Sequence, residues 1–307
     1  MNKKPIRLIE LFAGIGTQYQ ALKRIGADVE SYLISDWNIP SNIAYRTMLK
    51  AVNDIPEEID YTDGLTRVEV EDKLIALGLS LDGKNPLLKK TLKRKNEKWQ
   101  RDILNSFYYT HNFGSITNIH AEDLKITEKD KYDYYMTYSF PCQDLSLAGK
   151  QAGMKKGSGT RSGLLWEVER LLQESADKGL ELPDVLLMEN VPQVCSGKNK
   201  EDFEDWKNFL SSLGYKNFVK ILDAADFEVP QSRKRCFMVS ILKDVSYEFP
   251  EAIPLTRCIS DILEIEVDEK YYINTPKAKE LIQSLIDRGE LSDRNVFCAD
   301  GNINILK

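Results

Sequence analysis

Histidine is scarce in this chain of 307 residues, since His111 and His120 are the only two. Catalysis by a Ser-His or Cys-His pair is therefore poorly provided for. Cysteine is also sparse, and its five positions are widely spaced, odd in number and without a metal-ligand pattern. This usage favours reduced thiols in a cytoplasmic protein without a metal site.

Long apolar runs and an excess of positive charge are also lacking. No apolar stretch approaches the length of a membrane span and no signal peptide is evident, so we expect a soluble protein with no membrane partner. The net charge is −6, so the overall charge of the protein does not attract a polyanion such as DNA or RNA. Any contact with nucleic acid must come from a local basic patch.

The most informative stretch of the chain is Tyr138–Leu147. The aromatic-rich run Lys131–Thr137 predicts a strand, which Pro141 must end because proline cannot continue a ladder. Cys142 follows at the carboxyl edge of that strand, where open α/β sheets bind ligands. A thiol there is either a nucleophile or a small buried apolar residue, and its position alone does not decide between them.

The first 35 residues read as the opening unit of a Rossmann-like fold. Ile6–Phe12 predicts a strand, Gly14 and Gly16 a tight turn, and Gln18–Ile25 a helix. The third glycine of the dinucleotide fingerprint is missing, which argues against NAD. The alternative is a generic α/β turn with no ligand.

A second strand, Ser31–Ser35, ends at Asp36 and Trp37. A carboxylate in this position can bind ribose hydroxyls, and an indole can stack on adenine. A tight glycine turn without a pyrophosphate suits S-adenosylmethionine best.

Residues 40–112 interrupt the alternation of strands and helices. Eight lysines and arginines from Lys84 to Arg101, against the single Glu97, are interspersed with apolar residues at helical spacing. We expect an inserted amphipathic helical element with a basic face. Such a face is either a solvated surface or a contact for DNA or RNA.

The alternation then resumes with a third-strand segment, Phe113–Thr117, and the glycine-rich stretch 147–160 predicts an unpacked, mobile lid. After a helix at Leu164–Glu174, the apolar run Asp184–Met188 predicts a buried parallel strand that ends at Glu189. A helix at 203–213 and a hairpin of strands at 216–222 and 236–241 follow.

Arg233 and Arg235 alternate along the hairpin and are expected to share a face. A thiol, a carboxyl group and two guanidinium groups at one sheet edge suit addition to an electron-poor ring. A thiolate can add to a ring carbon, a glutamic acid can protonate a ring nitrogen, and arginines can bind an exocyclic oxygen. A pyrimidine activated in this way can accept a methyl group, provided that it leaves its duplex stack.

In four segments the chain resembles the DNA (cytosine-5-)-methyltransferase family, and the likeness extends from Leu8 to about Ile241. The four occur in the family's order, with the glycine-rich stretch between the second and the third. They are the cofactor loop Phe12-Ala13-Gly14-Ile15-Gly16-Thr17, the nucleophile loop Phe140-Pro141-Cys142-Gln143, the acid strand Glu189-Asn190-Val191, and Gln231-Ser232-Arg233-Lys234-Arg235.

The resemblance implies a role for each matching residue. Cys142 would attack carbon 6 of a flipped-out cytosine, Glu189 would contact nitrogen 3 and the exocyclic amine, and Arg235, helped by Arg233, would bind oxygen 2. DNA contacts would come from Gln143, Ser146, Asn190 and Gln231. S-adenosyl-L-methionine would be bound by Phe12, Ala13, Gly14, Ile15, Gly16, Thr17, Asp36, Trp37, Ser115, Ile116, Pro141 and Leu164.

The implied fold is a Rossmann-like S-adenosylmethionine-dependent methyltransferase fold, with a mostly parallel sheet, helices on both faces and the helical insertion at 40–112. Residues 1–250 would form the catalytic domain, and 251–307 the start of a truncated target-recognition domain. The implied partner is double-stranded DNA, methylated as in restriction-modification systems. Where the family usually has an aspartate that binds the adenine amine, this chain has Ser115, so either cofactor affinity is lower or Asn118 substitutes.

The late DNA-contact motif and the final asparagine-containing helix of the family are not found in this sequence. We therefore expect either a truncated gene or a second polypeptide that supplies the remainder. Two other functions stay open: a catalytically inactive cofactor- or DNA-binding remnant, and an RNA cytosine methyltransferase.

Overall fold

The computed structural model describes residues 4–53, 59–145, 153–157, 159–264, 266–272, 274–289, 296–299 and 302–305. The chain divides into two compact units, Met1–Pro254 and Leu255–Lys307, and each is described by itself. Within these described ranges no helix has the length and apolar character needed to cross a membrane.

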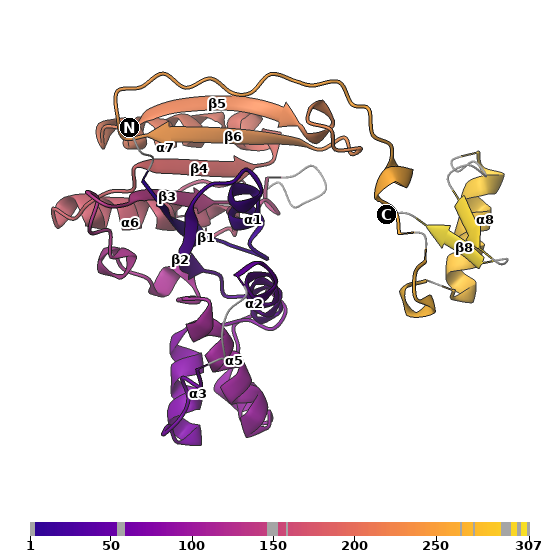
Figure 1. Ribbon diagram of the computed structural model, residues 1–307, viewed down its shortest axis with the longest axis horizontal. Helices are drawn as coiled ribbons and strands as arrows, with labels where there is room; N and C mark the ends of the chain where they lie inside the picture. Colours follow the sequence, from indigo (N-terminus) through magenta and orange to yellow (C-terminus); the bar gives the residue numbers. More distant parts are fainter. Residues whose placement is uncertain are drawn as a thin grey trace. The chain divides into compact units, whose positions relative to one another are not determined.

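The first unit is built on a six-stranded sheet of order β2-β1-β3-β4-β6-β5 (Figure 1). β1 to β4 run parallel, and β6 is antiparallel to both of its neighbours. The carboxyl ends of β1 to β5 and the start of β6 therefore lie at one edge. The strands are β1 (Ile6–Leu11), β2 (Val29–Ser35), β3 (Asp133–Tyr138), β4 (Val185–Asn190), β5 (Lys216–Asp223) and β6 (Lys234–Ile241).

Helices lie on both faces of this sheet, so the expected Rossmann-like fold is confirmed. Helices α6 (Leu165–Asp177) and α7 (Lys200–Ser212) cover the rear face in Figure 1, where their apolar side chains pack on Met136 and Met188. The front face carries α1 (Thr17–Arg24) and α2 (Ile39–Asn53). Tyr19 and Tyr45 from these two helices pack on Leu8 and Ile34 of the sheet.

The insertion forms a separate helical block beyond α2 in Figure 1. It contains α3 (Arg67–Ala76), the single turn α4 (Lys89–Leu92) and α5 (Glu97–Tyr109). The block has its own apolar core, which is distinct from the two cores that flank the sheet. Its buried residues are Ile39, Val70, Leu74, Leu79, Leu87, Leu92, Ile103, Leu104 and Phe107.

The strand expected at Phe113–Thr117 does not form. Only an isolated parallel bridge joins Asn112 to Ile34, and Ile116–Asn118 is a 3-10 turn. The cause lies at Gly114, which has φ +75° and leaves 2.1 Å between the position of a Cβ and the Leu77 carbonyl oxygen. This close approach to the end of α3 turns the chain away from the sheet.

The predicted lid at 147–160 falls partly outside the described residues, which omit 146–152 and 158. In the part that is described, Met154 is fully buried and its carbonyl accepts a 2.6 Å hydrogen bond from the Trp166 indole. The prediction of an unpacked segment is therefore wrong for Gly153 and Met154. One apolar side chain among glycines and lysines is enough to anchor the chain to the core.

One face of β3, β4 and β6 carries no helix among the described residues of the first unit. A groove of about 1,100 Å³ runs along it, bounded on one side by Gln18, Ala21 and Ile25 of α1. The strand residues on its floor are apolar and mostly half-buried, whereas their sequence neighbours under α6 and α7 are fully buried. The floor residues are Tyr135, Thr137, Val185, Leu187, Phe237, Val239 and Ile241.

The second unit contains α8 (Pro276–Asp287), whose first turn is capped by the Thr275 hydroxyl accepting from the Ala278 amide at 3.3 Å. An antiparallel pair, β7 (Val296–Ala299) and β8 (Asn302–Ile305), follows the helix.

A buried acid on β1 predicts how the stability of the first unit depends on pH. Glu10 is fully buried, and burial raises its pKa to about 7, although hydrogen bonds from the Tyr45 hydroxyl and the Tyr19 backbone act in the opposite direction. A carboxyl group with a raised native pKa binds more protons in the folded state than in the unfolded state. The free energy of unfolding should therefore fall by about 3 kcal/mol as the pH rises from about 4.5 to about 7.

The Glu10→Gln variant should lack this component, because the amide oxygen can still accept from Tyr45 but carries no charge. Urea unfolding of both proteins at pH 5 and pH 8 gives the comparison. We expect the variant to be the more stable of the two at pH 8 and the difference to shrink at pH 5. Equal differences at the two pH values would contradict the prediction.

Candidate active site

A cavity of about 690 Å³ opens at the carboxyl edge of β1 to β4. It brings together residues that the sequence analysis selected from seven separate segments. These are Phe12, Asp36, Trp37, Ser115, Ile116, Pro141, Cys142, Gln143, Leu164, Glu189, Asn190, Arg233 and Arg235.

The remaining selected residues lie elsewhere. Ala13, Gly14, Ile15 and Thr17 line the apolar groove beside the cavity, and Ser146 lies outside the described residues. Gln231 lines neither space. Gly16 also lines neither the cavity nor the groove. A Cβ at this position would come within 2.5 Å of Met48 Cε, so close packing against α2 explains why a glycine is needed here.

The thiol of Cys142 is half-buried in a loop that is tied down on both sides. The Ser162 hydroxyl donates to the Pro141 carbonyl at 2.7 Å. The Asp144 carboxylate accepts from the backbone amides of Arg161 and Ser162 at 2.8 and 3.3 Å. The start of α6, preceded by the 3-10 turn Ser162–Leu164, thus fixes the loop that carries the thiol.

Asn190 joins this loop to the end of β4. Its side-chain amide donates to the Phe140 carbonyl at 2.9 Å, and its Oδ1 accepts from the Val191 amide at 2.8 Å. Asn190 is itself buried, so these bonds are shielded from water. The strands that deliver Cys142 and Glu189 are therefore linked where both end.

Glu189 and Arg235 form an ion pair, with 2.9 Å between Oε1 and Nε. Glu189 lies directly opposite Phe237 in the antiparallel ladder, so Arg235 is its diagonal neighbour on the same face. Arg233 precedes β6 and is exposed, and it lines the cavity without contacting Glu189 in any described bond. Both arginines that we expected to act together therefore line the cavity, but Arg235 is half-buried and Arg233 is exposed.

Asp36 forms the acidic end of the cavity. Its two oxygens accept from the backbone amides of Gly14 at 2.7 Å and Asn38 at 2.8 Å, so the carboxylate connects the glycine turn to the end of β2. Burial raises the pKa of Asp36 to about 6, and these two hydrogen bonds oppose that shift. Phe12, with φ +59°, turns the chain sharply beside it.

Ser115 rather than Asn118 faces the cavity. The Ser115 hydroxyl shares a 2.8 Å hydrogen bond with Thr117, which also lines the cavity. The Asn118 amide instead donates to the Ala76 carbonyl at 2.8 Å, at the end of α3. The polar group available at the aspartate position of the family is therefore the serine hydroxyl.

Other cavity residues were missed by the sequence analysis: Ser35, Asn38, Ser41, Gly83, Lys84, Gly114, Thr117, Ser139, Phe140, Arg161 and Val191. Two of these residues stood out in the sequence and could have been selected. Lys84 begins the basic run, and Arg161 precedes the helix that follows the glycine-rich stretch. For Asn38 and Ser41 no local pattern existed.

The residues present fit an adenosyl cofactor. A largely buried acid, two aromatic side chains and a volume within the range of small-molecule sites of about 300–1,000 Å³ suit a nucleoside. No group of three or more metal-ligating side chains occurs in the described ranges. A Rossmann-like sheet with a nucleoside-type pocket, and a cavity shared by a thiol and a Glu-Arg pair, are typical of a group-transfer enzyme.

Residues 73–298 match the family model of C-5 cytosine-specific DNA methylases. The orphan methyltransferase M.SssI of Spiroplasma monobiae is 40% identical over 272 residues, or 88% of this chain and 68% of the relative. The type II methyltransferase M2.ScrFI of Lactococcus lactis subsp. cremoris is 33% identical over 97% of this chain and 76% of its own. The chain belongs to the C-5 cytosine-specific DNA methylase family and is a DNA (cytosine-5-)-methyltransferase.

Solved structures show the same fold at low identity. The Entamoeba histolytica methyltransferase EhMeth aligns with a TM-score of 0.56 at 18% identity, over 92% of this chain and 67% of its own. The Dnmt2 methyltransferase of S. pombe aligns with a TM-score of 0.53, also at 18% identity, over 94% of this chain and 67% of its own.

Proposed function

We propose that this chain methylates carbon 5 of cytosine in double-stranded DNA through a covalent adduct with Cys142. The observation that carries the proposal is the single cavity in which the Cys142 thiol, the Glu189–Arg235 ion pair and the Asp36 carboxylate all take part. The cytosine would have to leave its stack to enter this cavity.

Cys142 would begin the reaction as a thiolate. Its sulfur forms a bond to carbon 6 of the ring, and the electrons of the 5,6 double bond move toward the ring carbonyl and nitrogen 3. Arg235 binds oxygen 2, where negative charge develops, and Glu189 protonates nitrogen 3. Carbon 5 thereby becomes nucleophilic.

S-adenosyl-L-methionine would supply an electrophilic methyl group when bound. Asp36 would bind its ribose hydroxyls, and Phe12 and Trp37 would contact its adenine. After transfer, water would take up the carbon 5 proton and nitrogen 3 would return its proton to Glu189. The electrons of the carbon 5–hydrogen bond would re-form the 5,6 double bond and expel the sulfur, which restores the aromatic ring and the Cys142 thiolate.

Duplex DNA that contains 5-fluorocytosine tests this proposal directly. Fluorine cannot leave as the carbon 5 proton does, so the enzyme should remain attached to the DNA through Cys142. We expect a denaturation-resistant complex that requires S-adenosylmethionine and is absent with ordinary cytosine. Peptide mapping that placed the DNA on another residue would refute the assignment of Cys142.

We also propose that the apolar groove receives an amphipathic helix from a second polypeptide. α1 already covers the same sheet face beside it, and strands of six to eight residues suit a helix about 20 Å long. The groove shares Phe12, Ser139, Glu189 and Arg233 with the cavity, so such a helix would complete one wall.

The fluorocytosine experiment also tests the need for a partner and the possibility of an inactive remnant. The purified chain alone should form the adduct slowly, and co-expression with the product of the neighbouring reading frame should increase the rate of trapping. Full trapping by the chain alone would contradict the second-polypeptide proposal and exclude the remnant.

A further inference from the structure

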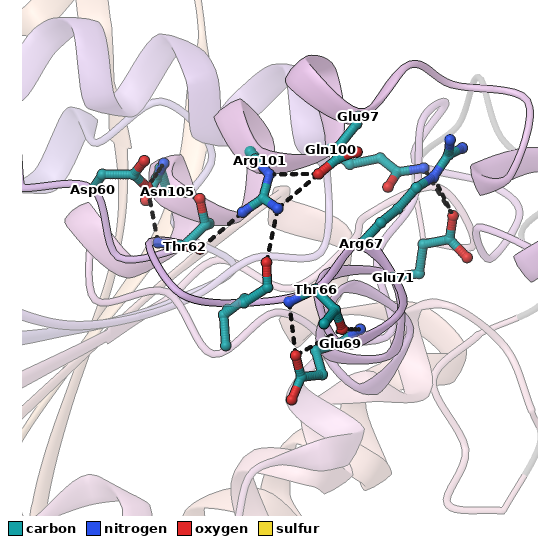
Figure 2. Close-up of polar contacts among 11 residues, drawn as sticks. Asp60, Thr62, Thr66, Arg67, Glu69, Glu71, Glu97, Gln100, Arg101 and Asn105 are labelled. Atoms are coloured by element: carbon teal, nitrogen blue, oxygen red, sulfur yellow. Dashed lines mark hydrogen bonds and ion pairs between the residues drawn. The ribbon is translucent and has the colours of Figure 1, made fainter.

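The insertion is a packed helical block, and some of its cations bind its own backbone and carboxylates. Arg101 donates to the Thr62 and Leu65 carbonyls, both at 2.8 Å, and to the Glu97 carboxylate at 2.7 Å (Figure 2). Arg67 pairs with Glu71 at 3.1 Å in the same view. The basic run is therefore not a uniform charged face, because some of its cations are bound within the block and others are exposed to solvent.

Backbone contacts fasten this body to the cofactor side of the cavity. The Ser80 amide donates to the Trp37 carbonyl at 2.8 Å, and the Ile39 amide donates back to the Ser80 carbonyl at 2.9 Å. The Ser115 amide donates to the Leu77 carbonyl at 2.9 Å, where Gly114 also makes its close approach. The insertion therefore cannot shift without moving the residues that follow β2.

From this attachment the loop Ser80–Asn85 reaches the cavity in a fixed conformation. Asp82 Oδ1 accepts from the backbone amides of Lys84 and Asn85, both at 2.8 Å, and these bonds hold the pKa of Asp82 well below its usual range. Gly83 has φ +65°, and a Cβ there would lie 3.0 Å from Asn38 Nδ2. Gly83 and Lys84, at the tip of this turn, line the cavity.

Arg161 connects the loop tip to the segment that carries the thiol. Its Nη1 donates to Gln143 Oε1 at 2.7 Å, and its Nη2 donates to the Lys84 carbonyl at 3.3 Å. Both acceptors are neutral, so the guanidinium charge is not compensated by them. In the described part of the chain the Lys84 ammonium is exposed and makes no ion pair.

Lys84 and Arg161 thus both line the cavity of a chain whose net charge is −6, and neither forms an ion pair with another described residue. We propose that the Lys84 ammonium binds a backbone phosphate of the DNA at the cavity mouth, and that Arg161 is a positioning residue that holds the Lys84 loop against Gln143. This inference rests on the proposed function and extends it, because it makes the helical insertion part of the DNA-binding surface.

The test is equilibrium binding of the full-length Lys84→Ala protein to a mixed-sequence DNA duplex at several salt concentrations. Removing one phosphate contact should weaken binding roughly tenfold at low salt and reduce the slope of log K against log salt by about one. Lys98→Ala is the matched control, since Lys98 is exposed on α5 and does not line the cavity. It should bind DNA as the wild type does, and Lys84→Arg should retain most of the affinity.

Binding of S-adenosylmethionine, measured by calorimetry, distinguishes a DNA phosphate from the carboxylate of the cofactor. A Lys84→Ala protein with normal DNA affinity but weakened cofactor binding would overturn the proposal, and so would equal losses in Lys84→Ala and Lys98→Ala. If the wild type forms the fluorocytosine adduct while Lys84→Ala binds DNA normally, this inference alone fails. If the wild-type protein neither binds duplex DNA nor forms the fluorocytosine adduct, both this inference and the proposed function are refuted.

Discussion

The Cys142→Ala protein is expected to lose methyl transfer by more than about 10³-fold, because no other group can form the bond to carbon 6. Incorporation of labelled methyl groups into duplex DNA measures the effect. Binding of S-adenosylmethionine should be nearly unchanged, since Asp36 and Trp37 lie in a different part of the cavity wall. The loop should keep its shape, because its bonds run through the Pro141 carbonyl and Asp144 rather than through the sulfur.

Cys258→Ala provides the control for this prediction. Cys258 is exposed and belongs to the second unit, so its removal should leave activity intact. Substantial methylation by the Cys142→Ala protein would reject the covalent route altogether.

The second large effect is expected at Glu189. The Glu189→Gln protein should lose activity by roughly 10²- to 10⁴-fold, because a glutamine cannot transfer a proton to the ring nitrogen. Adduct formation with 5-fluorocytosine should slow in parallel, since protonation accompanies the attack of the thiolate. Single-turnover methylation and trapping rates measured on the same preparations give the comparison.

Two further variants show whether the effect is specific to the Glu189 site: one changes its ion-pair partner, and the other changes a distant glutamate. The Arg235→Ala protein should also trap slowly, because Glu189 loses its ion-pair partner and oxygen 2 loses its donor. Glu181→Gln is the control, because the Glu181 carboxylate is largely exposed and 3.6 Å from Lys129. Unchanged trapping by Glu189→Gln would remove this residue from the mechanism, even with Cys142 retained.

The sequence was most informative where a strand ends at a proline. Pro141 and Pro192 stop two neighbouring parallel strands, and the residues just before or after each stop line one cavity. Strand termination is a local property, and the sheet then brings the ends of parallel strands to one edge. For this reason Cys142, Glu189 and Asp36 could be selected before any contact was known.

Features set by distant contacts were not predictable in this way. The missing strand at Phe113–Thr117 follows from the approach of Gly114 to α3, which lies in another part of the sequence. The burial of Met154 depends on Trp166, and the place of Lys84 depends on the attachment of Ser80 to Trp37. Composition showed that the insertion was basic, but only packing separates Arg101, which holds the block together, from Lys84 at the cavity.

The adjacency of β3 and β4 has a consequence for how such an enzyme can change. Glu189 lies on β4 and Cys142 in the loop that follows β3, and the separation of these two neighbouring strands, about 4.8 Å, is set by the backbone ladder. The Asn190 amide closes that ladder at its open end. Substitutions in residues that contact the DNA bases can therefore change the recognised sequence while the pairing of β3 and β4 keeps the ends of these two strands together.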